Sequence, residues 1–185
     1  MITQDQNYGT TFTVDRPAQQ VFDAINKVTD WWSQEIIGVT DRVGGQFHYH
    51  YENVHRCTLR VTELVPGRRV AWHVVDNYFD FVQDQDEWKD TDIVFDITET
   101  SDGTEVRFTH AGLTPQFQCY DVCSNAWTGY LTGSLRELIL TGQGQPNPKG
   151  GDTPEHQEAA IEHRSKRAPV AAASARSLTA SSLGD

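Results

Sequence analysis

Basic side chains are scarce in this chain of 185 residues, which has 15 lysines and arginines against 26 aspartates and glutamates and a formal net charge of −11. Residues 143–185 hold equal numbers of both signs, so the whole acidic excess lies before residue 143. An acidic surface repels phosphate backbones and anionic membrane surfaces. We therefore expect neither a nucleic acid nor a membrane as a partner.

Long apolar runs and paired cysteines are also missing. No stretch approaches the length of a membrane span, and residues 1–9 lack the basic start and the apolar run of a signal peptide. Cys57, Cys119 and Cys123 are an odd number of cysteines without CxxC spacing, which is typical of reduced thiols. A phosphate-binding glycine loop and the GxSxG and HExxH motifs are absent, so no cofactor is expected. These absences predict a soluble protein of the cytoplasm.

Aromatic side chains are absent from residues 143–185, which are rich in Gly, Pro, Ala and Ser. Such a composition offers too little apolar surface to form a core. We expect a short flexible start at residues 1–8, one folded domain at residues 9–142 and a disordered tail at residues 143–185.

Apolar and polar side chains alternate along much of the expected domain, as they do in antiparallel strands with one covered face. The predicted strands are residues 10–14, 35–40, 46–51, 56–65, 69–75, 92–100 and 105–110. After the first strand, Pro17 followed by the apolar Val21 and Ile25 predicts a short helix, and Trp31-Trp32 a second helical turn.

One long amphipathic helix is predicted over residues 124–141, ending at Gly142. Its apolar stripe consists of Trp127, Leu131, Ser134, Leu135 and Leu138. We expect the helical section to start at Thr114, as the cap, and Pro115. Together these elements predict an α+β fold, with a curved antiparallel sheet of about seven strands wrapped around one long C-terminal helix.

Several short motifs follow one another in a specific order. They are Val14-Asp15-Arg16-Pro17, Trp31-Trp32, Val43-Gly44-Gly45-Gln46-Phe47, Leu64-Val65-Pro66-Gly67 and His110-Ala111-Gly112-Leu113. Their order and spacing resemble the START-like (SRPBCC) superfamily, and within it homologues of the activator of heat-shock-protein-ninety ATPase, C-terminal domain. The resemblance covers about residues 8–142 and implies the helix-grip fold. It leaves the function open, because the superfamily includes lipid and hormone carriers, aromatase/cyclase-type enzymes and chaperone-associated modules.

The predicted inward face of the sheet is rich in aromatic side chains. It carries Phe47, Tyr49, Trp72, Phe95, Phe108 and His110, opposite Trp127, Tyr130 and Leu131 on the helix. Aromatic walls with a few polar tips suit a flat or fatty molecule, although the same residues can form a packed core. We expect a non-enzymatic domain that binds a small hydrophobic or aromatic ligand between sheet and helix. Tyr49 and His110 would supply the polar contacts.

His110 is the most informative titratable residue, because it ends the last predicted strand on the inward side. We expect it to be structural, with its ring hydrogen-bonded to a turn carbonyl. The alternative is a cyclase/aromatase-type enzyme in which His110, with Tyr49 or Tyr130, holds or protonates a carbonyl as general acid or base.

Other chemically active side chains receive structural interpretations. His48, His50 and His73 are expected on the outward face without a metal, although two histidines at i and i+2 can ligate zinc. Cys119 and Cys123 are expected to be buried as small apolar residues. Gly129 and Gly133 form a small-xxx-small pattern, which predicts close packing on a strand or on a dimer partner. The oligomeric state is left open.

Residues 76–92 form an acidic segment interleaved with Tyr78, Phe79, Phe81 and Trp88. Because four large aromatic side chains would otherwise be exposed, we expect a loop or small helix folded over the sheet edge. This segment also supports an alternative function, a protein-interaction module that regulates a chaperone or another ATPase through Asp84, Asp86 and Glu87.

Overall fold

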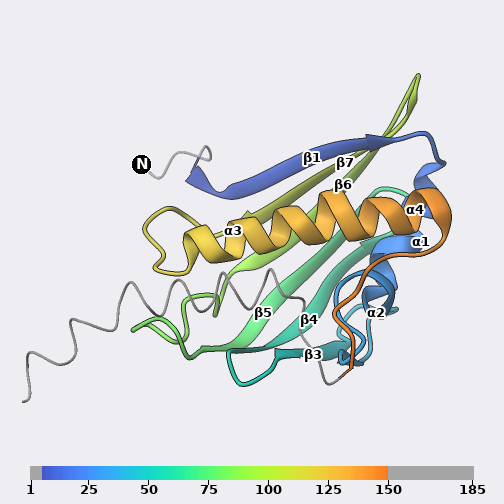
Figure 1. Cartoon of the computed structure of the whole chain (residues 1–185). Coiled ribbons are helices and arrows are strands. Elements are labelled where there is room, and N and C mark those ends of the chain that lie inside the picture. The colour runs from blue at the N-terminus through green and yellow to red at the C-terminus, as the bar shows by residue number, and fades with distance from the viewer. Residues whose placement is uncertain (1–5, 150–185) are drawn as a thin grey trace, which may run out of the picture.

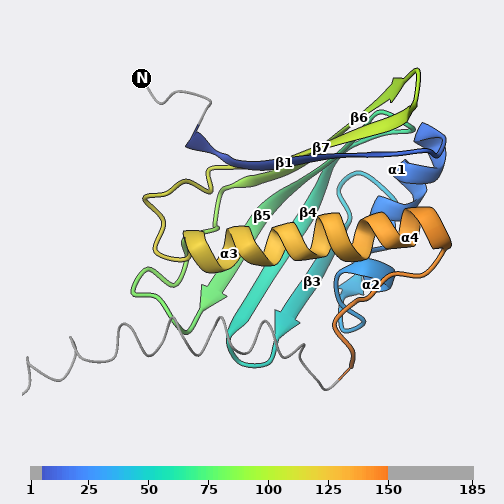
Figure 2. The same ribbon diagram turned by 45° about the horizontal axis from the view of Figure 1, so that its top comes forward.

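A computed structural model describes residues 6–149, which form a curved seven-stranded antiparallel sheet in the order β1-β7-β6-β5-β4-β3-β2. The strands are β1 (Tyr8–Val14), β2 (Ile37–Gly38), β3 (Gln46–Tyr51), β4 (His55–Val65), β5 (Arg69–Phe79), β6 (Asp92–Thr100) and β7 (Gly103–Ala111). The helices are α1 (Ala18–Asn26), α2 (Val28–Trp31), α3 (Tyr120–Thr128), η2 (Gly129–Leu135) and α4 (Arg136–Thr141). The last three form one continuous rod across the sheet, with α1 and α2 beside its α4 end (Figure 1, Figure 2). The predicted helix-grip architecture is confirmed.

Period-two burial explains why the strands could be located from sequence. In β3, for example, Phe47, Tyr49 and Tyr51 are buried while the residues between them are exposed. Strands β3 and β6 have their predicted bounds, and β1, β4 and β7 each extend one or two residues beyond theirs at one or both ends. The other two strands differ more. The edge strand β2 has only two residues, and β5 continues to Phe79, which pairs with His55. This extension carries the sheet into the acidic segment.

The folded domain extends beyond both of its predicted ends, residues 9 and 142. Tyr8 is part of β1, where its backbone N–H donates to the Leu113 carbonyl at 2.8 Å. At the other end, Asn147 is buried, its N–H donates to the Trp32 carbonyl at 2.9 Å, and its carbonyl accepts from the N–H of Gln34 at 2.9 Å. Residues 143–149 therefore pack on the domain, which corrects the predicted boundary at residue 142. The remaining residues of the expected tail lie outside the described part of the chain.

The long helix begins at Tyr120, four residues before the predicted start, and Thr114 is not its cap. The Phe117 N–H donates to the Thr114 carbonyl in a turn that precedes the helix. The carboxylate of Glu87, from the acidic segment, instead accepts hydrogen bonds from the backbone N–H groups of Gln118 and Cys119. A buried negative charge thus satisfies free N–H groups at the positive end of the helix dipole.

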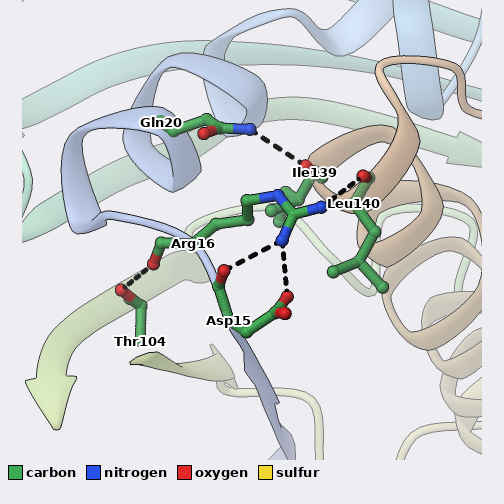
Figure 3. Close-up of polar contacts among 6 residues, drawn as sticks. All are labelled: Asp15, Arg16, Gln20, Thr104, Ile139 and Leu140. Atoms are coloured by element: carbon green, nitrogen blue, oxygen red, sulfur yellow. Dashed lines mark hydrogen bonds and ion pairs between the residues drawn. The ribbon is translucent and has the colours of Figure 1, made fainter. Parts of the chain in front are cut away.

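The other end of the helix is held by the side chains of Arg16 and Gln20 (Figure 3). The Arg16 guanidinium donates to the Leu140 carbonyl at 2.9 Å, and the Gln20 side chain donates to the Ile139 carbonyl at 3.1 Å. The helix stops at Gly142, which has φ +83°, as predicted. A positive side chain therefore satisfies one carbonyl at the negative end of the helix, and a neutral amide satisfies a second.

Gly129 and Gly133 do not pack closely on the sheet. Both are exposed, and a Cβ at either position would meet no atom within 4 Å among the described residues. The predicted close packing on a strand is therefore wrong, whereas packing on a dimer partner stays a prediction. Both glycines lie in η2, where the helix widens to π-type hydrogen bonding for seven residues.

Candidate ligand-binding cavity

A cavity of about 200 Å³ lies between the α3–η2 part of the helix and one end of the sheet. Strands β3, β4 and β5 form its floor, and the acidic segment and the residue after α2 supply further walls. Its lining consists of Trp32, Tyr49, Tyr51, Val54, His55, Phe79, Phe81, Trp88, Val122, Cys123, Asn125, Ala126, Trp127, Gly129 and Tyr130. None of these side chains is an aspartate, glutamate, lysine or arginine, so the cavity is aromatic and carries no formal charge at neutral pH.

Three of the nine predicted ligand-binding residues line this cavity, namely Tyr49, Trp127 and Tyr130. The others lie in the packed core beside it; these are Phe47, Trp72, Phe95, Phe108, His110 and Leu131. Edge-to-face contacts fill the space there, with ring centroids 5.2 Å apart for Trp72 and Phe95 and 5.1 Å apart for Phe95 and Phe108. The inward aromatic face therefore divides into a packed half and a half that borders the cavity.

Two tryptophans that were not assigned to the site form much of its wall. Trp32 stacks on Tyr49 with ring centroids 4.6 Å apart, and Trp88 stacks on Trp127 at 5.8 Å with an interplanar angle of 11°. The indole N–H of Trp88 has no hydrogen-bond acceptor among residues 6–149. The sequence did indicate that Trp88 is buried, because a large ring among acidic residues would otherwise be exposed to water.

His55 is a third cavity residue that the sequence reasoning missed. Its ring is buried, lies 4.7 Å from Trp88 and 4.3 Å from Phe79 between centroids, and its Nε2 is 2.9 Å from Asn77 Oδ1. Burial lowers its pKa to about 3, although the Asn77 hydrogen bond partly opposes the shift. The alternation of β4 did indicate this position, because His55 lies two residues before the inward-facing Cys57 and therefore on the same face of the strand.

His110 is buried in a chain of hydrogen bonds and does not line the cavity. Trp127 Nε1 donates to its Nδ1 at 3.2 Å, so the neutral ring carries its proton on Nε2 and donates to Thr91 Oγ1 at 2.8 Å. Thr91 in turn donates to the Trp88 carbonyl. Burial, with the nearby His55 second, lowers the pKa of His110 to about 3. The partners are side chains rather than the predicted turn carbonyl.

This geometry gives no support to His110 as a general acid or base. Such a group must reach the reacting atom directly or through one water, and both nitrogens of His110 are engaged inside the core. The phenol oxygens of Tyr49 and Tyr130 lie 3.5 Å from each other instead, and Asn147 Nδ2 donates to the Tyr130 oxygen at 2.7 Å. Burial raises the pKa of Tyr49, which stays protonated.

The cysteines are buried, as predicted for Cys119 and Cys123. Burial raises the pKa of Cys57, and burial together with the neighbouring Cys123 raises that of Cys119. Neither is therefore a thiolate at neutral pH. Cys123 is the thiol that lines the cavity.

The outward histidines each have a separate partner. His48 lies 2.8 Å from the Thr58 hydroxyl, His50 3.1 Å from the Glu35 carboxylate and His73 2.8 Å from the Asp92 carboxylate. No three His, Cys, Asp or Glu side chains of residues 6–149 are grouped as metal ligands.

The acidic segment folds inward as expected, with Phe79, Phe81 and Trp88 buried and Tyr78 half-buried under the Arg56 guanidinium, 4.3 Å from the ring centroid. Asp84 and Asp86 are exposed. Glu87 is buried beneath the start of the helix, so it does not contribute to an acidic docking surface. The segment is thus both a wall of the cavity and a support for the helix.

The family model described as Activator of Hsp90 ATPase homolog 1-like protein matches residues 15–139. The chain belongs to this family. No curated protein matches it. Within residues 6–149, no helix has the length and apolar character needed to cross a membrane.

Solved structures similar to this Activator of Hsp90 ATPase homolog 1-like chain include the Aha1 dimer from Colwellia psychrerythraea, with a TM-score of 0.61 and 21% identity over 75% of this chain and 98% of that one. CalU16 from Micromonospora echinospora has a TM-score of 0.53 and 20% identity over 87% and 85% of the two chains. A Mesorhizobium loti protein has a TM-score of 0.59 and 17% identity over 73% and 96%. Identities this low show a shared fold alone.

Proposed function

We propose that this domain binds a small hydrophobic or aromatic molecule in the cavity beneath α3 and η2, without catalysing a reaction. The observation that carries the proposal is an uncharged aromatic cavity of about 200 Å³ at the edge of the buried hydrophobic core. An apolar cavity of about 150 Å³ holds benzene, so this one has room for one ring or two fused rings. Tyr49, Trp88, Trp127 and Tyr130 would contact the guest.

A cavity-filling substitution tests this proposal with naphthalene as the probe. Ala126 lines the cavity from the helix, so Ala126→Phe places a ring where the probe would bind. We expect calorimetric titration to show naphthalene affinity reduced about tenfold or more, since the filled volume is no longer available. Thr132→Phe, on the exposed face of the same helix, is the matched control and should leave the affinity unchanged. Equal affinities of both variants and the wild type, or no binding to the wild type, would refute the proposal.

A second candidate function is regulation of an Hsp90-type ATPase, supported by the exposed carboxylates of Asp84 and Asp86 and by the family description. In this case Asp84→Lys with Asp86→Lys should abolish any stimulation of the ATPase rate. Glu99→Lys with Asp102→Lys changes the same charge at the exposed β6–β7 hairpin and should not. Stimulation that survives the first pair of substitutions would exclude this surface.

A further inference from the structure

His55 brings a polar ring into the aromatic wall of the cavity. It lies at the start of β4, and the rings of Tyr49, Phe79 and Trp88 pack around it with centroids 5.2, 4.3 and 4.7 Å away. A histidine in such surroundings needs hydrogen-bond partners for both ring nitrogens, because a buried polar atom without a partner has lost its hydration and gained nothing in return.

The orientation of Asn77 fixes which nitrogen of His55 carries the proton. Asn77 Nδ2 donates to the Gln85 carbonyl at 3.1 Å, so its Oδ1 is the atom 2.9 Å from His55 Nε2. An amide oxygen only accepts, and therefore Nε2 of the neutral ring is the donor. Nδ1 is left as an acceptor, and no hydrogen bond reaches it from any described residue.

The cavity also excludes charged guests. Its lining contains no lysine, arginine, aspartate or glutamate, and His55 is neutral at physiological pH because burial lowers its pKa. A carboxylate or an ammonium group would lose its hydration shell here without gaining a partner of opposite charge.

Together these features define a chemical class of ligand. We propose that the cavity selects neutral aromatic molecules of one or two rings that carry a hydroxyl group, and that His55 Nδ1 accepts the hydrogen bond from this hydroxyl. The inference rests on the proposed function and adds the polar group by which the guest is recognised. Asn77 is a positioning residue, since it holds the His55 tautomer that can accept.

Four probes of nearly equal shape test the selection on the wild-type chain at pH 7.5. These are 2-naphthol, which can donate, 2-methoxynaphthalene, which keeps the oxygen but cannot donate, naphthalene, and the anion 2-naphthoate. We expect calorimetric titration to give about 3- to 10-fold tighter binding of 2-naphthol than of 2-methoxynaphthalene, as one hydrogen bond provides. The anion should bind at least about tenfold more weakly than 2-naphthol.

The variant His55→Phe removes the acceptor and keeps a ring of similar size. The ratio of 2-naphthol to 2-methoxynaphthalene affinities should then fall to about 1, whereas His73→Phe, on the outward face, should leave it unchanged. If His55→Phe does not fold, the comparison of the probes on the wild type still decides.

The outcomes separate this inference from the proposed function. Binding of naphthalene without any preference for 2-naphthol, or with a preference that survives His55→Phe, overturns the role of His55 but leaves the ligand cavity intact. Failure of all four probes to bind overturns both.

Discussion

Individual polar residues connect the aromatic rings on one side of the cavity. The Trp127 indole donates to His110, His110 donates to Thr91, and Thr91 donates to the carbonyl of Trp88. Trp88 also stacks on Trp127, so the first and last residues of this chain of hydrogen bonds contact each other through their rings. Each donor in this chain has one acceptor, which fixes the tautomer of His110 and the position of the Trp127 indole.

Substitution of the two stacked tryptophans separates hydrogen bonding from ring packing. Trp127→Phe leaves His110 Nδ1 without a donor, whereas Trp88→Phe removes an indole N–H that has no acceptor within residues 6–149. We expect urea unfolding to show Trp127→Phe as the more destabilising of the two by about 1–3 kcal/mol. Trp127→Ala should cost about 3–5 kcal/mol, since the ring is buried. Equal losses for the two Phe variants would contradict the hydrogen-bonded chain.

The two buried histidines make stability depend on pH. Their pKa values are about 3 in the folded chain against an ordinary value of 6.5, so the unfolded chain binds more protons between these values. Their contribution is complete above about pH 6.5 and is lost as the pH falls toward 3. From pH 7.5 to 5.5 we expect the free energy of unfolding to fall by about 1.4 kcal/mol for each histidine.

Urea unfolding at several pH values measures this loss, and NMR titration assigns it. The ring signals of His55 and His110 should stay unshifted between pH 7.5 and 5.5 in the folded chain. Stability that is flat over this interval, or titration of either ring near pH 6.5, would contradict their burial as neutral groups.

Among the elements, the long helix is fixed at each end by a side chain whose charge is opposite to that end of the helix dipole. Glu87 binds the N–H groups before α3, and Arg16 binds a carbonyl at the end of α4 (Figure 3). The α4 half lies against α1 and β1, whereas the α3 half forms the wall of the cavity. The family-like Asp15-Arg16-Pro17 motif therefore has a structural role, which is to anchor the helix to the first strand.

Of these two anchors, Glu87 gives the clearer test, because its carboxylate is buried. Glu87→Gln replaces an acceptor oxygen by an N–H donor opposite backbone N–H groups, so we expect a loss of about 1–3 kcal/mol in urea unfolding. Asp86→Asn, at an exposed position next to it, should change stability by less than about 0.5 kcal/mol. A Glu87→Gln effect as small as the control would show that the helix start does not depend on this charge.

Substitution of the two glycines of η2 should increase stability, in contrast to substitution of Glu87. Neither needs glycine for space, and Gly129 has helical backbone angles of φ −63° and ψ −46°. Gly129→Ala and Gly133→Ala should therefore each stabilise the chain by about 0.4–1 kcal/mol in thermal unfolding. Gly103→Ala is the contrasting control and should destabilise, because its φ is +139° and a Cβ would lie 2.1 Å from the Val14 carbonyl oxygen. Destabilisation by both helix variants would indicate that the glycines serve a contact to another molecule.

At the scale of the whole molecule, the sequence predicts the sheet and its inward face because alternation is a local property of each strand. His55 lies one residue before the predicted strand at residues 56–65 and shares the inward parity of Cys57, so a strand predicted one residue longer would have included it. Alternation alone could not divide the aromatic face into core and cavity, since the division depends on where a segment distant in sequence folds. Trp88 and Glu87 belong to such a segment, and Asn147 reaches Tyr130 from a stretch that its composition assigns to the tail.

One measurement tests the ligand cavity most directly, namely intermolecular nuclear Overhauser effects from naphthalene bound to the full chain. We expect contacts from the naphthalene protons to the ring protons of Trp88, Trp127 and Tyr130, and none to Phe95 in the packed half of the core. Contacts confined to the outer face near Tyr78, or no contacts at saturating naphthalene, would contradict it.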